Sequence, residues 1–239
     1  MKLTFEPIHQ KMAVYSIPFV VFAACYLLNT TASLWWLVLS VVISLSISLS
    51  LSVGYHRLFS HMSYKCHRAW HYIFAIVGTC TFHASPISWV YVHRAHHRYS
   101  DTSKDSHITN WSIVFGDRYR KIDETLKGIT HLLKDPMHVF VHKYGLVFII
   151  TSLIVSFMLG INFFIFAYCL PVVFTTFVML MFQIYSHDKN GVVDRPYLEF
   201  ILPMSGEWTH RGHHSRPGDK FFGKFDLGAK VIKFIQING

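Results

Sequence analysis

Three short words hold eight of the 17 histidines in this 239-residue chain. They read HRLFSH (His56 and His61), HRAHH (His93, His96 and His97) and HRGHH (His210, His213 and His214). On an α-helix, residues i, i+3 and i+4 share a face, so each HxxHH word is expected to bring three imidazoles to one spot. Neutral imidazole is a good ligand for iron, zinc, copper and nickel, so the three words together predict metal binding.

The number of grouped histidines bears on the kind of metal site. A structural zinc site needs about four ligands and often uses cysteine. The four cysteines of this chain form no CxxC pair, and none lies in a histidine word. Eight grouped histidines therefore indicate two metals with positions left open for oxygen or substrate. Seven further histidines, among them His138, follow no ligand spacing and are expected to be surface or packing residues.

The segments that must position these histidines are apolar. The chain is 52% hydrophobic and only 15% charged, whereas a soluble domain has about 25% charged residues. Helices are expected in the apolar stretches, because an isolated strand would leave its backbone unsatisfied in lipid. A further apolar stretch, 72–92, is expected to lie against the membrane or the cytoplasmic domain. Four stretches approach the about 20 residues that cross a bilayer core, namely 12–28, 32–53, 144–160 and 161–184.

Basic residues are sorted to one side of these spans. None of the 22 Lys and Arg residues lies in the two connectors, NTT and GIN, that join the spans in pairs. The positive-inside rule therefore places both termini, both large polar segments and all three histidine words in the cytoplasm. The sequence thus predicts one all-α integral membrane domain over 1–239, with four transmembrane helices and a cytosolic helical cap that holds a histidine-rich di-metal site. The net charge of +9 fits contact with anionic lipid, and no nucleic-acid-binding signature is present.

The words around the histidines are similar to those of a known family. GYHRLFSHMSYK, WVYVHRAHHRYSD and GEWTHRGHHSRPGD resemble the three histidine boxes of the membrane fatty acid desaturases, in the same order. The resemblance is to the acyl-CoA (delta-9, stearoyl-CoA type) branch and runs from about Ser52 to the end of the chain. It implies a di-iron centre that uses O₂ and two electrons to introduce a cis double bond into a long acyl chain.

The resemblance also implies roles for residues outside the three words. The stretch QIYSHDKNG matches an NxxxH word of the family, which makes His187 a ninth metal ligand and places Gln183 where the family has an Asn that holds a metal-bound water. Trp89 matches a tryptophan beside the substrate tunnel. Acidic partners should fix the imidazole tautomers, and the acids close enough in sequence are Asp101, Glu207 and Asp219.

The chain departs from the family after the second histidine word. His107 fits the histidine of the family's DPH word, but the RGFxxSHxGW word that should follow is replaced by ITNWSIVFGDRYRKID. The acyl carrier therefore stays open between CoA, a lipid head group and acyl carrier protein. Basic residues are expected to suit CoA phosphates or anionic lipid equally: Arg57, Arg94, Arg98, Lys104 and Arg118.

The expected activity is an O₂-dependent acyl desaturase in a multi-pass membrane protein, located in the endoplasmic reticulum if eukaryotic or the inner membrane if bacterial. Its electrons would come from a separate protein, cytochrome b5 or a ferredoxin. A hydroxylase or ketolase with similar histidine boxes is the alternative within the enzymes. A histidine-rich metal-binding or transport protein is the alternative from another class, but its ligands should lie within the spans.

Overall fold

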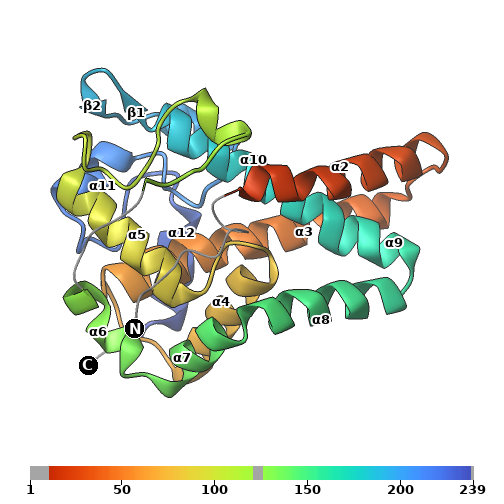
Figure 1. The fold of residues 1–239 in the computed structure, drawn as a ribbon, viewed down its shortest axis with the longest axis horizontal. Coiled ribbons are helices and arrows are strands. Elements are labelled where there is room, and N and C mark those ends of the chain that lie inside the picture. Colours follow the sequence, from red (N-terminus) through yellow and green to blue (C-terminus); the bar gives the residue numbers. More distant parts are fainter. Residues whose placement is uncertain (1–10, 121–125, 238–239) are drawn as a thin grey trace.

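The computed structural model describes residues 11–120 and 126–237. In these ranges the protein is mostly helical, and a bundle of long apolar helices carries a cap of shorter elements at one end (Figure 1). The bundle consists of α2 (Met12–Leu28), α3 (Leu34–Leu49) with its continuation η1 (Ser50–Ser60), α8 (Gly145–Met158), and α9 (Ile161–Phe163), which runs through η4 (Phe164–Cys169) into α10 (Leu170–Tyr185).

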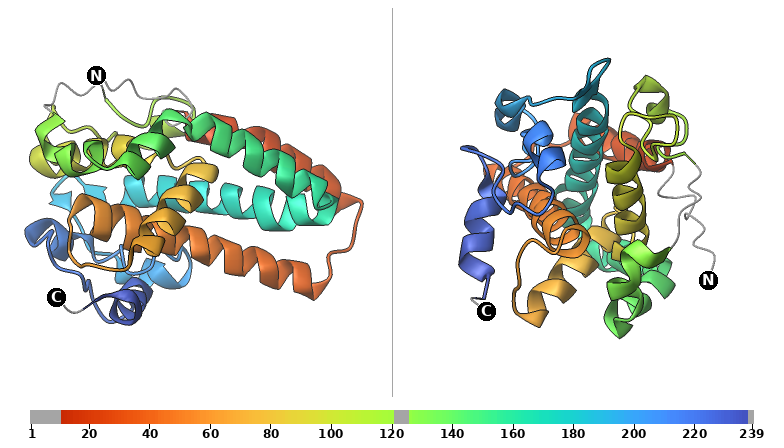
Figure 2. Two further views of the ribbon diagram at one scale, coloured as in Figure 1. Left: turned by 90° about the horizontal axis from the view of Figure 1, so that it is seen from below. Right: turned by 90° about the vertical axis from the view of Figure 1, so that its left-hand side faces the viewer.

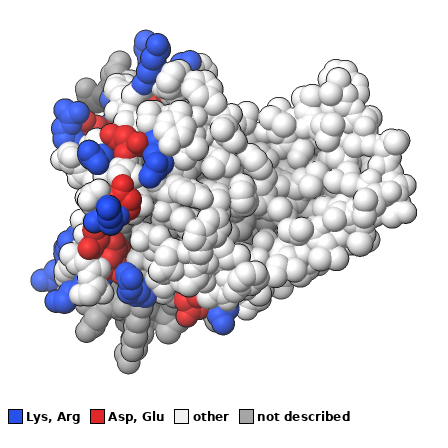
Figure 3. Space-filling model, turned by 90° about the horizontal axis from the view of Figure 1, so that it is seen from above, with Lys and Arg blue, Asp and Glu red and all other residues white. Residues whose placement is uncertain are grey.

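Length and composition qualify two of these helices to cross a membrane. They are the continuous helices Leu34–Ser60 and Ile161–Tyr185. A third span results if α7 (Pro136–Lys143) and α8 are counted together, although a bend of 67° separates them, and α2 is apolar but shorter. On the face shown in Figure 3 the charged side chains gather at the cap end, and the far end of the bundle carries none. These features are those of a membrane protein.

The cap wraps around η1, every residue of which is buried. Two further views show the bundle and the cap from below and end-on (Figure 2). Besides α7, the cap contains α4 (Arg68–Cys80), α5 (Pro86–Tyr99), η2 (Trp111–Val114), η3 (Leu126–Ile129), α6 (Thr130–Leu133), the hairpin of β1 (His187–Asp188) and β2 (Gly191–Val192), η5 (Pro196–Phe200), α11 (His210–Ser215) and α12 (Leu227–Ile235).

Local sequence signals explain where the helices of the cap begin. The side chain of Ser85 accepts from the Ser88 amide, and Pro86 occupies the first turn of α5, where its missing N–H is no loss. The Asp226 carboxylate caps α12 through the Ala229 amide at 2.8 Å. The apolar stretch 72–92 is accordingly divided between α4 and α5, so it does not form a fifth continuous helix.

The second span differs from its prediction in a way that matters for the site. The helix does not end near Val53 but continues as a π-helix to Ser60, so His56 lies inside it. The amide of His61 donates to the carbonyl of His56 at 3.2 Å. An i→i+5 register stacks residues five apart, and it therefore turns His56 and His61 to the same side. The apolar run ends before the helix does because the cap, not lipid, surrounds its last turns.

Candidate metal centre and adjoining cavity

The histidines of the three words gather into two groups, and each group could hold one metal ion. Within a group, one ligand nitrogen from each residue lies within 4.8 Å of all the others. The five-histidine group contains His56, His61, His93, His97 and His213, and the four-histidine group contains His96, His187, His210 and His214.

Each HxxHH word contributes to both groups, so the expectation that three imidazoles meet at one spot was wrong. The i and i+4 residues of α5, His93 and His97, belong to the five-histidine group, whereas His96 belongs to the other. In α11 the assignment is reversed, because His210 and His214 belong to the four-histidine group and His213 belongs to the five-histidine group. On each helix the i+3 side chain points away from the side chains at i and i+4. The helices α5 and α11 can therefore each supply imidazoles to both groups.

Carboxylates fix one imidazole nitrogen in three of the nine histidines. His56 Nδ1 lies 2.6 Å from Glu207 Oε2, His96 Nδ1 lies 2.8 Å from Asp105 Oδ1, and His187 Nδ1 lies 2.8 Å from Asp101 Oδ1. A neutral imidazole carries one proton, and a carboxylate holds that proton at Nδ1. The opposite nitrogen, Nε2, is then left with a free lone pair.

The contacts between the imidazoles test whether a metal fits. His213 Nε2 lies 2.8 Å from His56 Nε2 and 2.9 Å from His97 Nε2. The Glu207 contact leaves His56 Nε2 without a proton, and a single proton on His213 could serve only one of its two neighbours. A cation shared by all three resolves the conflict: with a metal–nitrogen distance of about 2.0–2.1 Å, neighbouring ligands at right angles are about 3 Å apart. The donor set therefore fits a metal.

Burial keeps these imidazoles in the form that binds metal. Desolvation, reinforced by His56 and other neighbours, lowers the pKa of His61 to about 2. Burial likewise lowers the pKa of His93, His210 and His213 well below the usual value. The neutral ring, which is the metal ligand, is thus the favoured form at physiological pH.

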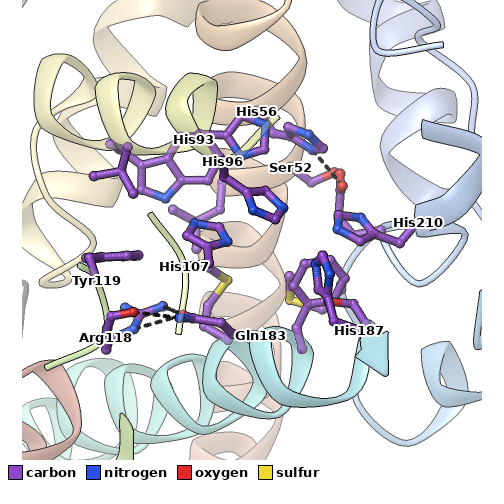
Figure 4. A pocket seen from close by; sticks show the side chains of 18 residues that line it. Ser52, His56, His93, His96, His107, Arg118, Tyr119, Gln183, His187 and His210 are labelled. Carbon is purple, nitrogen blue, oxygen red and sulfur yellow. Dashed lines mark hydrogen bonds and ion pairs between the residues drawn. The ribbon is translucent and has the colours of Figure 1, made fainter. Parts of the chain in front are cut away.

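An apolar cavity adjoins both groups. Trp89 lines it and stacks on His93, with ring centroids 4.7 Å apart and planes at 21°. Leu51, Met179 and Phe182 supply apolar wall from the two longest helices. The side chains of His56, His93, His96 and His210, which belong to the two groups, point toward the same space as His187 (Figure 4). An apolar chain in this cavity would lie beside the imidazoles.

Several predicted residues have other contacts than expected. The Gln183 amide is fully engaged, because its oxygen accepts from Arg118 and its nitrogen donates to the carbonyls of Ile108 and Arg118 at 2.8 and 2.9 Å. It therefore has no group left for a metal-bound water. Asp219 is exposed and pairs with Arg216 at 3.1 Å rather than with a histidine.

Arginines expected at a carrier surface are also placed differently. The half-buried guanidinium of Arg94 donates to the carbonyls of Ser60 and Gly128 and lines a second cavity, which His61 and His97 share. Arg57 and Arg118 are buried, so neither is available to a CoA phosphate at the surface.

Two polar residues near the metal groups were not assigned roles from the sequence. Asp105 anchors His96, and it lies only two residues before His107 in the sequence. The His107 ring stacks on His96 with centroids 4.1 Å apart and lines the cavity. The signal for Asp105 is its position in the DTSKDSH segment after the second histidine word, which also contains Asp101.

No family model matches the chain. Among curated proteins it is similar to an sn-1 stearoyl-lipid 9-desaturase of Anabaena variabilis, with 27% identity over 79% of this chain and 76% of the relative. A probable acyl-CoA desaturase of Schizosaccharomyces pombe is 30% identical over 71% of this chain. A Delta(9)-fatty-acid desaturase of Caenorhabditis elegans is 27% identical over 70%. The matches span 40% and 57% of the yeast and nematode proteins.

Proposed function

We propose that this chain, which belongs to the fatty acid desaturase family, removes two hydrogens from neighbouring methylenes of a long acyl chain and leaves a cis double bond between them. The observation that carries the proposal is the pairing of two imidazole groups, three of whose members have their tautomers fixed by carboxylates, with an apolar cavity. In the balanced reaction O₂ takes up two electrons and two protons besides the two hydrogens of the substrate, and two waters are formed.

The metal in this proposal is iron, one ion in each histidine group. Bound iron supplies the O₂-dependent oxidation of an unactivated C–H bond. The protein's own contribution is to present nine imidazoles. Glu207, Asp105 and Asp101 hold protons on the far nitrogens of three of them. The apolar wall of Trp89, Leu51 and Met179 keeps water from the reacting carbons and positions the alkyl chain beside the ligands.

The membrane arrangement extends this proposal. The four-span topology uses α2, the helix Leu34–Ser60, α8 with α7 leading into it, and the helix Ile161–Tyr185. The cap, with all nine histidines, then faces the cytosol, in keeping with the charged side chains at the cap end on the face shown in Figure 3 and with the absence of Lys and Arg from the two connectors. An acyl chain could enter from the lipid side as an acyl-CoA or a membrane lipid, and a separate cytochrome b5 or ferredoxin would deliver electrons from the cytosolic side.

Expression in a host that lacks its own desaturase tests the proposal. Fatty acid profiling should show a new monounsaturated chain that depends on O₂. A His96→Ala variant, expressed at the same level, serves as the matched inactive control because it removes one ligand of the four-histidine group. Accumulation of a hydroxylated or keto chain in place of the alkene would instead favour a histidine-box hydroxylase or ketolase.

A further inference from the structure

Two arginines are enclosed in the cap, and they differ in how their charge is balanced. Arg57 is 0% exposed and bonds to two carboxylates, Glu207 at 3.2 Å and Asp226 at 2.8 Å. Arg118 is 4% exposed, and the acceptors that it meets among the described residues are neutral. It donates to the Gln183 amide oxygen at 3.0 and 3.3 Å and to Met12 Sδ at 3.1 Å. Within residues 11–120 and 126–237, no carboxylate pairs with Arg118.

The Arg118 guanidinium retains hydrogen-bonding capacity. It has five N–H groups, and the contacts to Gln183 and Met12 use three of them. The side chain lines the cavity that also contains His96 and His107 (Figure 4). A buried charge without an opposite charge is costly to keep, and here the unused donors belong to a side chain that lines a cavity with both apolar and imidazole walls.

The backbone holds Arg118 in this place. The 106–120 segment folds back on itself, with the Ile108 amide donating to the Arg118 carbonyl at 3.1 Å and the Arg120 amide donating to the Ser106 carbonyl at 2.8 Å. The Gln183 amide nitrogen donates to the same Arg118 carbonyl at 2.9 Å. Arg118 Cζ also lies 5.1 Å from the centroid of the Tyr119 ring. These contacts tie the segment in place, but among the described residues none of them brings a carboxylate to the guanidinium.

We propose that Arg118 is a ligand-binding residue that receives the carboxyl-derived oxygen of an acyl chain inside the cavity. The inference rests on the proposed function for the identity of the ligand as an acyl chain. The alkyl part of such a chain has no acceptor, so its carboxyl end, free or esterified, is the one part that can pair with Arg118. The planar guanidinium suits a carboxylate or carbonyl oxygen better than an ammonium would.

The test measures binding, not turnover. Isothermal titration of the purified, metal-loaded full chain in detergent compares dodecanoate, methyl dodecanoate and dodecanol. Arg118→Leu should weaken dodecanoate binding about tenfold to hundredfold, the range for a lost hydrogen bond to a charged group, and leave dodecanol unchanged. Arg118→Lys keeps the positive charge but lacks the planar guanidinium, so its affinity for dodecanoate should lie between those of the wild type and Arg118→Leu. Arg216→Leu is the control for loss of one positive charge, because its side chain is 76% exposed.

The outcomes separate the two sources of the oxygen. If Arg118→Leu weakens the binding of dodecanoate alone, the ligand group is a free carboxylate. If it also weakens the binding of methyl dodecanoate, the ligand group is the carbonyl. Equal weakening of all three ligands, or none, overturns the inference. If Arg118→Leu does not fold, Arg118→Gln replaces it. Alkene formation by a chain whose Arg118→Leu variant binds dodecanoate normally would sink this inference alone, whereas Arg118-dependent binding without any alkene would sink only the proposed function.

Discussion

Replacing Asp105 with Asn should cost the protein one metal while leaving the fold in place. Asp105 Oδ1 lies 2.8 Å from His96 Nδ1, and both side chains are buried. The same carboxylate accepts from the amides of His107 at 2.8 Å and Asp101 at 2.9 Å. Three donors thus converge on two oxygens. An amide offers only one oxygen, so it must leave at least one donor without a partner and lets the His96 ring turn.

The expected magnitude follows from the role of such partners. Loss of a carboxylate that orients a metal-bound histidine lowers metal affinity about 10- to 100-fold, which corresponds to about 1.4–2.7 kcal/mol. Only the four-histidine group contains His96, so the loss should affect one site. The metal content of the variant, measured by mass spectrometry after dialysis against increasing chelator, should fall from two ions toward one at a lower chelator concentration than in the wild type.

Asp219→Asn is the matched control for Asp105→Asn. Asp219 also lies near a histidine word in the sequence, but it is exposed and pairs with Arg216. This variant should keep both metals at the wild-type chelator midpoint. The reasoning is refuted if Asp105→Asn keeps both metals just as firmly, or if the two variants lose metal to the same extent.

Three further predictions address the ligand set, the topology and the pH dependence. His187→Ala should lose metal and activity as severely as a box-histidine variant, whereas His138→Ala, a residue outside both groups, should retain metal; equal metal content in the two would remove His187 from the site. A cysteine introduced at Thr31 should react with an impermeant reagent only from the side opposite the cap, and one at Ser103 only from the cap side; the reverse would contradict the four-span arrangement. The metal-free protein should melt at progressively lower temperature as pH falls below about 6.5. Burial lowers the folded-state pKa of His61 to about 2, so protons bind preferentially to the unfolded chain in this pH range. A melting temperature that rises on acidification would contradict this.

Sequence patterns were sufficient to predict which histidines come together. The three histidine words and His187 all enter the two groups, and Glu207 and Asp101 do anchor histidines as expected. The grouping was predictable because histidines three or four apart on a helix lie close together, although each HxxHH word divides between the two groups. Asp101 contacts His187 although 86 residues separate them. Both lie beside the β1–β2 turn, where Gly191 has a φ of +97°. A Cβ added to Gly191 would lie 3.3 Å from the Asp101 carboxylate.

The remaining features depend on backbone geometry that residue types do not reveal. The spacing of His56 and His61 suits a π-helix, whereas the length of the apolar stretch predicted a helical span that ends at Val53. Asp105 contacts His96, whereas Asp219 pairs with Arg216, because the loop that holds Asp105 folds back over His96. The engagement of Gln183 with Arg118 required the 106–120 segment to pack on α10, and this is the segment in which the chain departs from the family's word.

The most direct test of the central claim follows the hydrogens of the substrate. Cells that lack their own desaturase and express this chain are fed fully deuterated octadecanoate, and the recovered fatty acids are analysed by mass spectrometry. The proposed chemistry predicts a product that has lost two deuterium atoms, has gained no oxygen and disappears in the His96→Ala variant. A product that has lost one deuterium and gained one oxygen, or an alkene formed equally well by the His96→Ala variant, would contradict the account.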